Sequence, residues 1–170
     1  LINTGYINSI REIWWDIRPH HNFGTVEIRM CDLPPSLDHV IALTALIQCM
    51  VVAISERIDE GLYLPEYHPM MVAQNKWRAM RYGASARLVD TDDHQRYPVQ
   101  DLIDRLVDQL LPVARQLGCV AELQACSRLP AQTGAQEQIE IYRETESKEE
   151  VVRRMIALHH RRSGERQLVS

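Results

Sequence analysis

The chain has 170 residues, 45% of them hydrophobic and 25% charged, with a formal net charge of −4, a composition typical of a soluble globular protein with an ordinary core. Because the charge gives no basic surface, nucleic acid is not expected as a partner. No membrane is expected either, since even the apolar run Val40–Ile54 is interrupted by Thr44 and Gln48 and stays below the roughly 18 residues of a membrane span.

The first 30 residues predict a short helical turn followed by two antiparallel strands. Isoleucines spaced by three between residues 7 and 13 favour the turn. The first strand is expected at about Ile13–Arg18, ended by Pro19, which has no N–H for a ladder. Residues 20–24 form a connection of hairpin length. From Thr25 to Met30, polar and apolar residues alternate, as in a strand with one buried face.

A long apolar helix is predicted next. Residues 32–35 contain two prolines and break the strand, and Ser36 is a suitable N-cap. The run Val40–Ile54 is apolar on nearly every face, so we expect a helix that is buried on most sides. Gly61 ends it.

The rest of the chain is predicted to be mainly helical. Helices are expected at about Met70–Tyr82, 98–117, 119–129, 134–144 and, from a capping box of Ser147 with Glu150, to about Arg161. Pro112 should kink or break the second of these. Its expected core side is Leu102, Ile103, Leu106, Leu110, Val113 and Leu117, and that of the last helix is Val151, Val152, Met155, Ile156 and His159.

An acidic turn at Asp90–His94 interrupts the helices. It could suggest a calcium site, but it lacks the glycine and the distal glutamate of an EF-hand loop. A hairpin tip or a plain loop is therefore preferred. With two strands followed by helices, and with no long linker or repeat, the chain is predicted to be one α+β domain portion.

The cysteines and histidines give little sign of a metal site. Four cysteines are scattered without a CxxC pair, which favours reduced thiols in a cytoplasmic protein over zinc or disulfides. His20 and His21 are adjacent in a loop, so their side chains should diverge rather than share a metal. The sequence also contains no GxSxG, P-loop or GxGxxG motif.

The polar faces of the two strands carry the main candidate site. Asp16 and Arg18 share one face of the first strand, and Glu27 and Arg29 share one face of the second. The backbones of Glu27 and Arg29, two residues apart along one strand, are roughly 6 to 7 Å apart. This suits a divalent cation held by Glu27 with Arg29 on a phosphate. It equally suits an ordinary ion pair, which spacing alone favours.

A second candidate site is the basic segment NKWRAMRYG, residues 75–83. Asn75, Arg78 and Tyr82 fall on one helical stripe, with Arg81 beside it. The stripe can face an anionic ligand, or it can be a solvated basic surface. The residues alone leave both open.

The strand segment WWDIRPHHNFGTVEIRMCDLP, the helix segment LIQCMV and then NKWRAMRYG resemble, in this order, the C-terminal half of the glutamate–cysteine ligase type 2 family, the bacterial carboxylate–amine ligases. The resemblance covers essentially the whole chain. It implies a glutamine synthetase-like fold and an ATP- and Mg²⁺-dependent ligase that joins glutamate to the amine of cysteine through an acyl phosphate. It also implies a cytoplasmic homodimer.

The same resemblance implies roles for single residues. Glu27 would bind Mg²⁺, with Thr25 orienting it, and Arg29 would contact the γ-phosphate or acyl phosphate. Arg18 would bind a substrate carboxylate or phosphate. Residues Asn75, Arg78 and Arg81, with Lys76 beside them, would border the nucleotide site.

The chain also departs from the family. The family's N-terminal half supplies an acidic GxEEE-type strand and an HVHVG-type strand, and neither is present. Because the chain starts with Leu1 and reaches the strands almost at once, we expect a fragment whose partner is the missing N-terminal half. The alternative is a structural or regulatory relative that keeps the fold without ligase activity.

Overall fold

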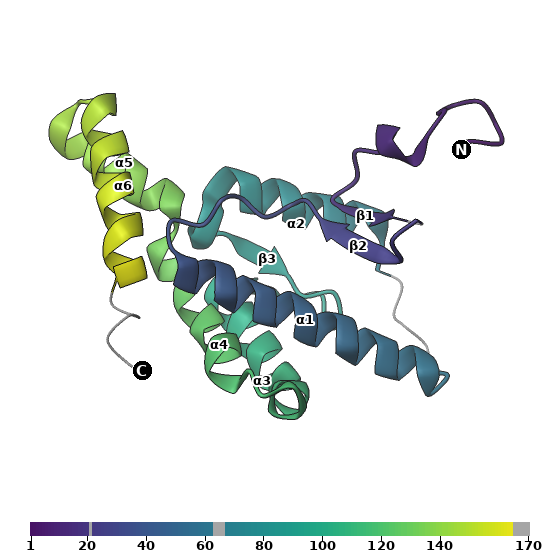
Figure 1. Cartoon of the computed structure of the whole chain (residues 1–170). Helices are drawn as coiled ribbons and strands as arrows, with labels where there is room; N and C mark the ends of the chain where they lie inside the picture. Colours follow the sequence, from purple (N-terminus) through teal and green to yellow (C-terminus); the bar gives the residue numbers. More distant parts are fainter. Residues whose placement is uncertain (21, 63–66, 165–170) are drawn as a thin grey trace. The chain divides into compact units, whose positions relative to one another are not determined.

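The computed structural model describes residues 1–20, 22–62 and 67–164. The chain divides into two compact units, Leu1–Leu33 and Pro34–Ser170, separated at the predicted breaker. Helices and small antiparallel sheets occur together (Figure 1), so the predicted α+β class is confirmed.

The first unit is a short helical turn followed by a β-hairpin. It contains η1 (Ile10–Glu12), β1 (Ile17–His20) and β2 (Thr25–Ile28). The strands pair antiparallel, with Arg18 opposite Glu27, which confirms the predicted hairpin. His21, in the connection, lies outside the described residues.

The prediction that Pro19 ends the first strand is wrong. Pro19 lies inside β1, opposite Val26. The Arg29 N–H donates to the Asp16 carbonyl at 2.8 Å. Hydrogen-bonded pairs alternate with non-bonded pairs in an antiparallel ladder, so two residues further on Arg18 and Glu27 are a bonded pair. Pro19 therefore occupies a non-bonded position, where a missing N–H costs no ladder bond.

Most of the apolar face of the hairpin is exposed and Ile28 is half-buried, which corrects the prediction of a strand with one buried face. Ile17, Val26 and Met30 are 48%, 56% and 56% exposed. A ladder of two four-residue strands is too small to cover one of its own faces. Among the described residues of this unit, one hydrophobic residue is buried, Ile13.

The second unit is mainly helical. Its elements are α1 (Leu37–Asp59), α2 (Pro69–Tyr82), η2 (Gly83–Ser85), β3 (Arg87–Val89), β4 (Arg96–Pro98), α3 (Val99–Leu117), α4 (Val120–Ala125), η3 (Cys126–Gln132), α5 (Gly134–Thr145) and α6 (Lys148–Gly164). Two predicted N-caps are confirmed. Ser36 Oγ accepts from the His39 N–H at 3.4 Å, and Ser147 Oγ accepts from the Glu150 N–H at 3.2 Å.

Strands β3 and β4 form a second antiparallel hairpin. Its two strands were not predicted. The acidic turn is its tip, so one of the two preferred interpretations is confirmed. Asp90 Oδ1 accepts from the Asp92 N–H at 2.9 Å, and Asp93 Oδ1 accepts from the Gln95 N–H at 2.8 Å. The carboxylates thus hold the turn itself.

Two helix predictions concern prolines. Helix α3 runs through Pro112 without a break, so of the two predicted outcomes, a kink or a break, the break is excluded. The helix predicted over residues 119–129 is instead α4 followed by the 3₁₀ helix η3. Leu129 precedes Pro130, and a residue before proline is disfavoured in α conformation.

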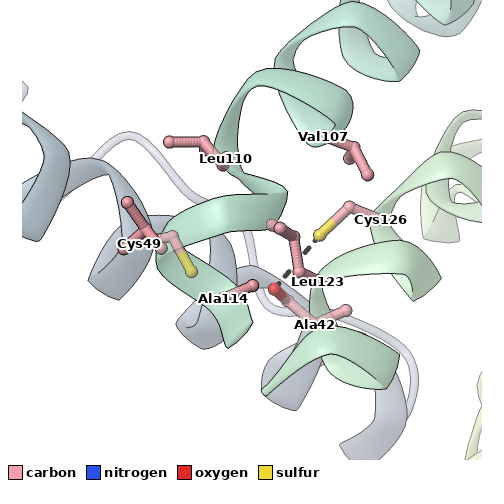
Figure 2. Close-up of a cluster of buried hydrophobic side chains, with 8 residues drawn as sticks. Ala42, Cys49, Val107, Leu110, Ala114, Leu123 and Cys126 are labelled. Carbon is pink, nitrogen blue, oxygen red and sulfur yellow. Dashed lines mark hydrogen bonds between the residues drawn. The ribbon is translucent and has the colours of Figure 1, made fainter. Parts of the chain in front are cut away.

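The core of the second unit lies where α1, α3 and α4 meet (Figure 2). Its buried members are Ala42, Cys49, Val107, Leu110, Val113, Ala114, Leu123 and Cys126. The Cys126 thiol donates to the Ala42 carbonyl at 3.1 Å. Cys49 and Cys119 have sulfurs 3.7 Å apart, and all four cysteines are free.

The predicted core sides of α3 and α6 are only partly right. In α3 the buried residues are Val107, Leu110, Val113 and Ala114, whereas Leu117 is exposed. Side chains as small as Ala42 and Ala114 can be fully buried where two helices approach closely, and hydrophobic size alone does not indicate this. In α6, Val152 and Ile156 are exposed, against the prediction.

The prediction that helix α1 is buried on most sides is wrong. Its buried residues are Ala42, Ala45 and Cys49. It also meets the length and composition of a membrane span, with a mean hydropathy of 2.0 over an 18-residue window of which 17% is buried. The sequence criterion missed this window because Thr44 and Gln48 counted as interruptions, although neither is charged. Composition does not distinguish a span from a helix covered by protein, so the absence of a membrane stays a prediction.

Candidate functional site

The β1–β2 hairpin brings Arg18, Glu27 and Arg29 together on one face, as predicted. Arg18 donates to the same Glu27 oxygen, Oε2, from Nε at 2.8 Å and from Nη2 at 2.5 Å. Arg29 Nε lies 3.9 Å from the other oxygen, Oε1. The spacing within the second strand had suggested a pair of Glu27 with Arg29, but the closer ion pair joins the two strands.

Both guanidinium groups have a second contact that fixes their position. The Arg29 guanidinium carbon lies 4.8 Å from the centroid of the Trp14 ring, within cation–π distance. Arg18 Nη1 lies 3.5 Å from the Arg11 carbonyl. Sequence reasoning missed the role of Trp14. Its parity could have indicated it, because Trp14, Asp16 and Arg18 alternate with Ile17 in the same segment.

The hairpin cluster carries two positive charges and one negative charge. Glu27 is 46% exposed, and the two arginine side chains are 20% and 27% exposed, so the cluster is open to solvent. Two guanidinium groups with one carboxylate between them suit a phosphate or carboxylate ligand.

The same cluster is a poor site for Mg²⁺ by itself. Among the residues that the structure describes, no group of three or more histidine, cysteine, aspartate or glutamate side chains is arranged to hold a metal. Glu27 can supply one oxygen ligand, Oε1, while Arg18 occupies Oε2. Any Mg²⁺ here would need ligands from phosphate groups and from other protein residues.

Helix α2 uses the predicted cofactor residues Asn75 and Arg78 in structural contacts. Asn75 Nδ2 donates to the Val89 carbonyl at 2.7 Å, and its Oδ1 accepts from the Val89 N–H at 2.8 Å. Arg78 Nε donates to the Arg87 carbonyl at 2.6 Å. These bonds join α2 to β3.

The other two basic residues of α2, Lys76 and Arg81, are exposed. Arg78 has a further contact within the helix: its guanidinium carbon lies 5.5 Å from the centroid of the Tyr82 ring. The α2 residues belong to the second unit and the hairpin cluster to the first, so each group is described by itself.

His20 contributes to the hairpin turn. Its ring stacks on Phe23 with centroids 4.5 Å apart, and it pairs with Thr25 across the strands. Thr25 and Glu27 both lie in β2. The orienting role of Thr25 stays a prediction.

A polar cluster that the sequence did not indicate lies at the β3–β4 tip. The Tyr97 hydroxyl donates to Asp93 Oδ2 at 2.6 Å, which lowers the pKa of the Asp93 carboxyl. The Arg105 guanidinium carbon lies 3.9 Å from the Tyr97 ring centroid, and Arg105 Nη1 donates to Asp90 Oδ2 at 3.3 Å. These contacts fix the tip on α3.

Comparison with known proteins gives a consistent result. The family model described as glutamate-cysteine ligase family 2 (GCS2) matches residues 1–157. A protein of Frankia casuarinae with the provisional name glutamate–cysteine ligase 2-1 is 52% identical over 123 residues, which are 72% of this chain and 32% of the relative. Proteins of Gloeobacter violaceus and Solibacter usitatus, with the provisional name glutamate–cysteine ligase 2, are 42% and 34% identical over 86% and 92% of this chain.

The chain therefore spans only part of these relatives. The matched segments are 32%, 40% and 41% of the three relatives' own lengths. Both the hairpin cluster and helices α1 and α2 lie within the residues that the family model matches.

Proposed function

Since the chain belongs to glutamate–cysteine ligase family 2, we propose that it supplies part of the active site of an ATP-dependent carboxylate–amine ligase with a glutamine synthetase-like fold. In this reaction the γ-carboxylate of glutamate attacks the γ-phosphate of ATP, and ADP leaves. The amine of an acceptor, with cysteine suggested by the relatives' names, then displaces phosphate from the acyl phosphate and forms the amide.

The observation that carries the proposal is the hairpin cluster of Arg18, Glu27 and Arg29. Phosphoryl transfer depends mainly on positioning and on offsetting the charge of the transferred group. Arg29, which contacts the Trp14 ring, would bind a phosphoryl or acyl phosphate oxygen. Arg18 is held by Glu27 and can bind the substrate carboxylate or phosphate at its remaining N–H groups.

Bound Mg²⁺ would offset negative charge on the phosphate oxygens. In this proposal Glu27 provides one of its oxygen ligands, and the remaining protein ligands come from the part of the family domain outside the matched segment. Of the three α2 residues predicted to border the nucleotide, Arg81 is proposed to contact its phosphates, because it is exposed whereas Asn75 and Arg78 already bind backbone atoms. A cytoplasmic homodimer is part of the same proposal.

A second candidate is a relative that keeps the fold without ligase activity. The observation in its favour is that Arg18 already binds one oxygen of Glu27 and Arg29 lies near the other. If this pairing persists in the complete family domain, Glu27 has no oxygen available for a metal.

The test compares Glu27→Gln with the matched control Glu12→Gln. Each variant is measured in a polypeptide that joins this chain to the rest of the family domain, with glutamate, cysteine and Mg-ATP. Glu27→Gln should lower ADP formation by about 10²-fold or more, because it removes the carboxylate proposed to bind the Mg²⁺ that offsets the phosphoryl charge. Glu12→Gln should not, since Glu12 lies outside the hairpin cluster and accepts a bond from the Asn8 N–H.

Full activity of Glu27→Gln would exclude the assigned role of Glu27. Absence of Mg-ATP binding by the unsubstituted polypeptide in calorimetry would favour the relative without activity. A screen of amine acceptors would identify the acceptor. Phosphate release is measured for each amine with glutamate present.

A further inference from the structure

Two free thiols from distant parts of the chain meet inside the second unit. Cys49 lies in α1 and is fully buried in the core (Figure 2). Cys119 lies in the turn between α3 and α4, directly after Gly118, which ends α3 in a left-handed conformation. The two sulfur atoms are 3.7 Å apart, although the residues are separated by 70 positions in the sequence.

The two thiols are close enough to become a disulfide with a small movement. Their sulfurs are in contact, and a disulfide bond requires the separation to shorten to about 2.05 Å. Cys119 belongs to a turn, where the backbone adjusts more readily than inside a helix. The third thiol of the core, Cys126, instead donates to the Ala42 carbonyl at 3.1 Å.

The members of this pair differ in their access to solvent. Cys119 is half-buried, whereas Cys49 is 0% exposed. A small oxidant therefore reaches Cys119 first. Burial, together with the hydrogen bond to Cys119, raises the pKa of Cys49 to about 11, so Cys49 is a protected thiol at neutral pH. One thiol is thus accessible to an oxidant, and the other is held in contact with it.

We propose that Cys49 and Cys119 form a modification site, a dithiol that a peroxide converts into an intramolecular disulfide between α1 and the turn before α4. The free thiols of the structure are the reduced state of this site. The proposal is independent of ligase activity, because it depends only on contacts within the second unit.

The reaction has two steps. The Cys119 sulfur, as thiolate, attacks one oxygen of the peroxide, the O–O bond breaks, and the other oxygen takes up a proton and leaves as water. The Cys49 sulfur then attacks the sulfur of the resulting sulfenic acid. The S–O bond breaks, and the hydroxyl leaves with the Cys49 proton as a second water. Two thiols lose one electron each, and one hydrogen peroxide is reduced to two waters.

The test treats the purified chain with hydrogen peroxide, blocks the remaining thiols with iodoacetamide and maps cross-linked peptides by mass spectrometry without reduction. The unsubstituted chain should lose two hydrogen atoms and yield a Cys49–Cys119 peptide pair, and dithiothreitol should reverse both changes. The midpoint of thermal unfolding should be about 5–10 °C higher in the oxidised chain, because the cross-link closes a long loop in the unfolded state.

Cys119→Ala is the main variant, because Cys119 is only half-buried and its truncation is compatible with folding. It should abolish the cross-link and the shift in the midpoint, and Cys49→Ala should do the same. The matched controls Cys126→Ala and Cys31→Ala each remove a thiol outside the pair and should keep the cross-link. Circular dichroism establishes that each variant is folded.

A second measurement separates the effect of the fold from simple thiol reactivity. In urea the shortest loop among the four cysteines, between Cys119 and Cys126, should close in preference to the loop between Cys49 and Cys119. In the folded chain the order should be reversed.

Three results would overturn the proposal. The first is oxidation of Cys119 to a sulfinic or sulfonic acid without any disulfide. The second is a disulfide between other cysteines, including one that joins two chains through Cys31. The third is an equal yield of the Cys49–Cys119 cross-link in the folded chain and in urea.

Discussion

Cys126 shows how a single side chain takes its chemistry from its surroundings. It is 1% exposed and its thiol donates to the Ala42 carbonyl. Burial disfavours the thiolate and raises the pKa of Cys126 from 9.0 to about 11. Cys49, also buried, has its pKa raised to about 11 by burial and by the neighbouring Cys119. Cys31, by contrast, is exposed.

The raised pKa of Cys126 predicts a loss of stability at alkaline pH. Between about pH 9 and pH 11 the folded state keeps a proton that the unfolded state has released. Stability is therefore complete below this window and falls through it, by up to about 1.4 kcal/mol per pH unit for one thiol. Urea unfolding of Cys126→Ala across this range should show a shallower loss than that of the unsubstituted chain.

Cys31→Ala is the control, because it removes an exposed thiol instead of the buried one. Lysines and tyrosines that ionise in the same pH range affect all three proteins alike. The Cys31→Ala variant should therefore lose as much stability at alkaline pH as the unsubstituted chain. An identical pH dependence in Cys126→Ala would show that the Cys126 thiol has no raised pKa.

At the scale of elements, side chains of α2 hold the helix on β3. Asn75 makes two bonds with Val89, and Arg78 makes one with Arg87. The sequence placed both residues on one stripe correctly, but it could not show that backbone atoms of a later strand occupy them. Their predicted cofactor role thus competes with a structural role.

Asn75→Ala separates the two roles. Removing a half-buried side chain that satisfies two backbone groups should lower the free energy of unfolding by about 1–3 kcal/mol in urea titrations. Gln74→Ala, next to it and exposed, should change it by less than about 0.5 kcal/mol. Unchanged stability of Asn75→Ala with loss of Mg-ATP binding in the complete family domain would favour the cofactor role instead.

At the scale of the whole molecule, the buried core belongs to the second unit. All eight residues of the core cluster lie after residue 33, whereas Ile13 is the buried hydrophobic residue among those described in the first unit. The hairpin cluster is thus carried by a unit with little core of its own.

We expect the second unit to fold without the first. A polypeptide of residues 34–170 should keep its helical circular dichroism and a cooperative thermal transition, because it retains the full core cluster. A peptide of residues 1–33 should show no cooperative transition, since a two-stranded hairpin is marginal in water. Loss of the transition in residues 34–170 would show that the hairpin contributes to the core.

The sequence by itself determined the features that depend on neighbours along the chain. The caps Ser36 and Ser147, the glycine that closes α2 and the hairpin that brings Glu27 to Arg18 follow from local backbone chemistry and alternation. The strand motif also carried the resemblance that the family match confirmed.

Only the tertiary structure decided what depends on distant segments. It placed Pro19 at a non-bonded position, gave Asn75 to Val89 and left one face of α1 exposed. An apolar residue has the same sequence pattern whether its partner is present or not, because burial depends on which surfaces meet. The apolar character of α1 on nearly every face was therefore visible in the sequence, but only the fold shows which face is covered.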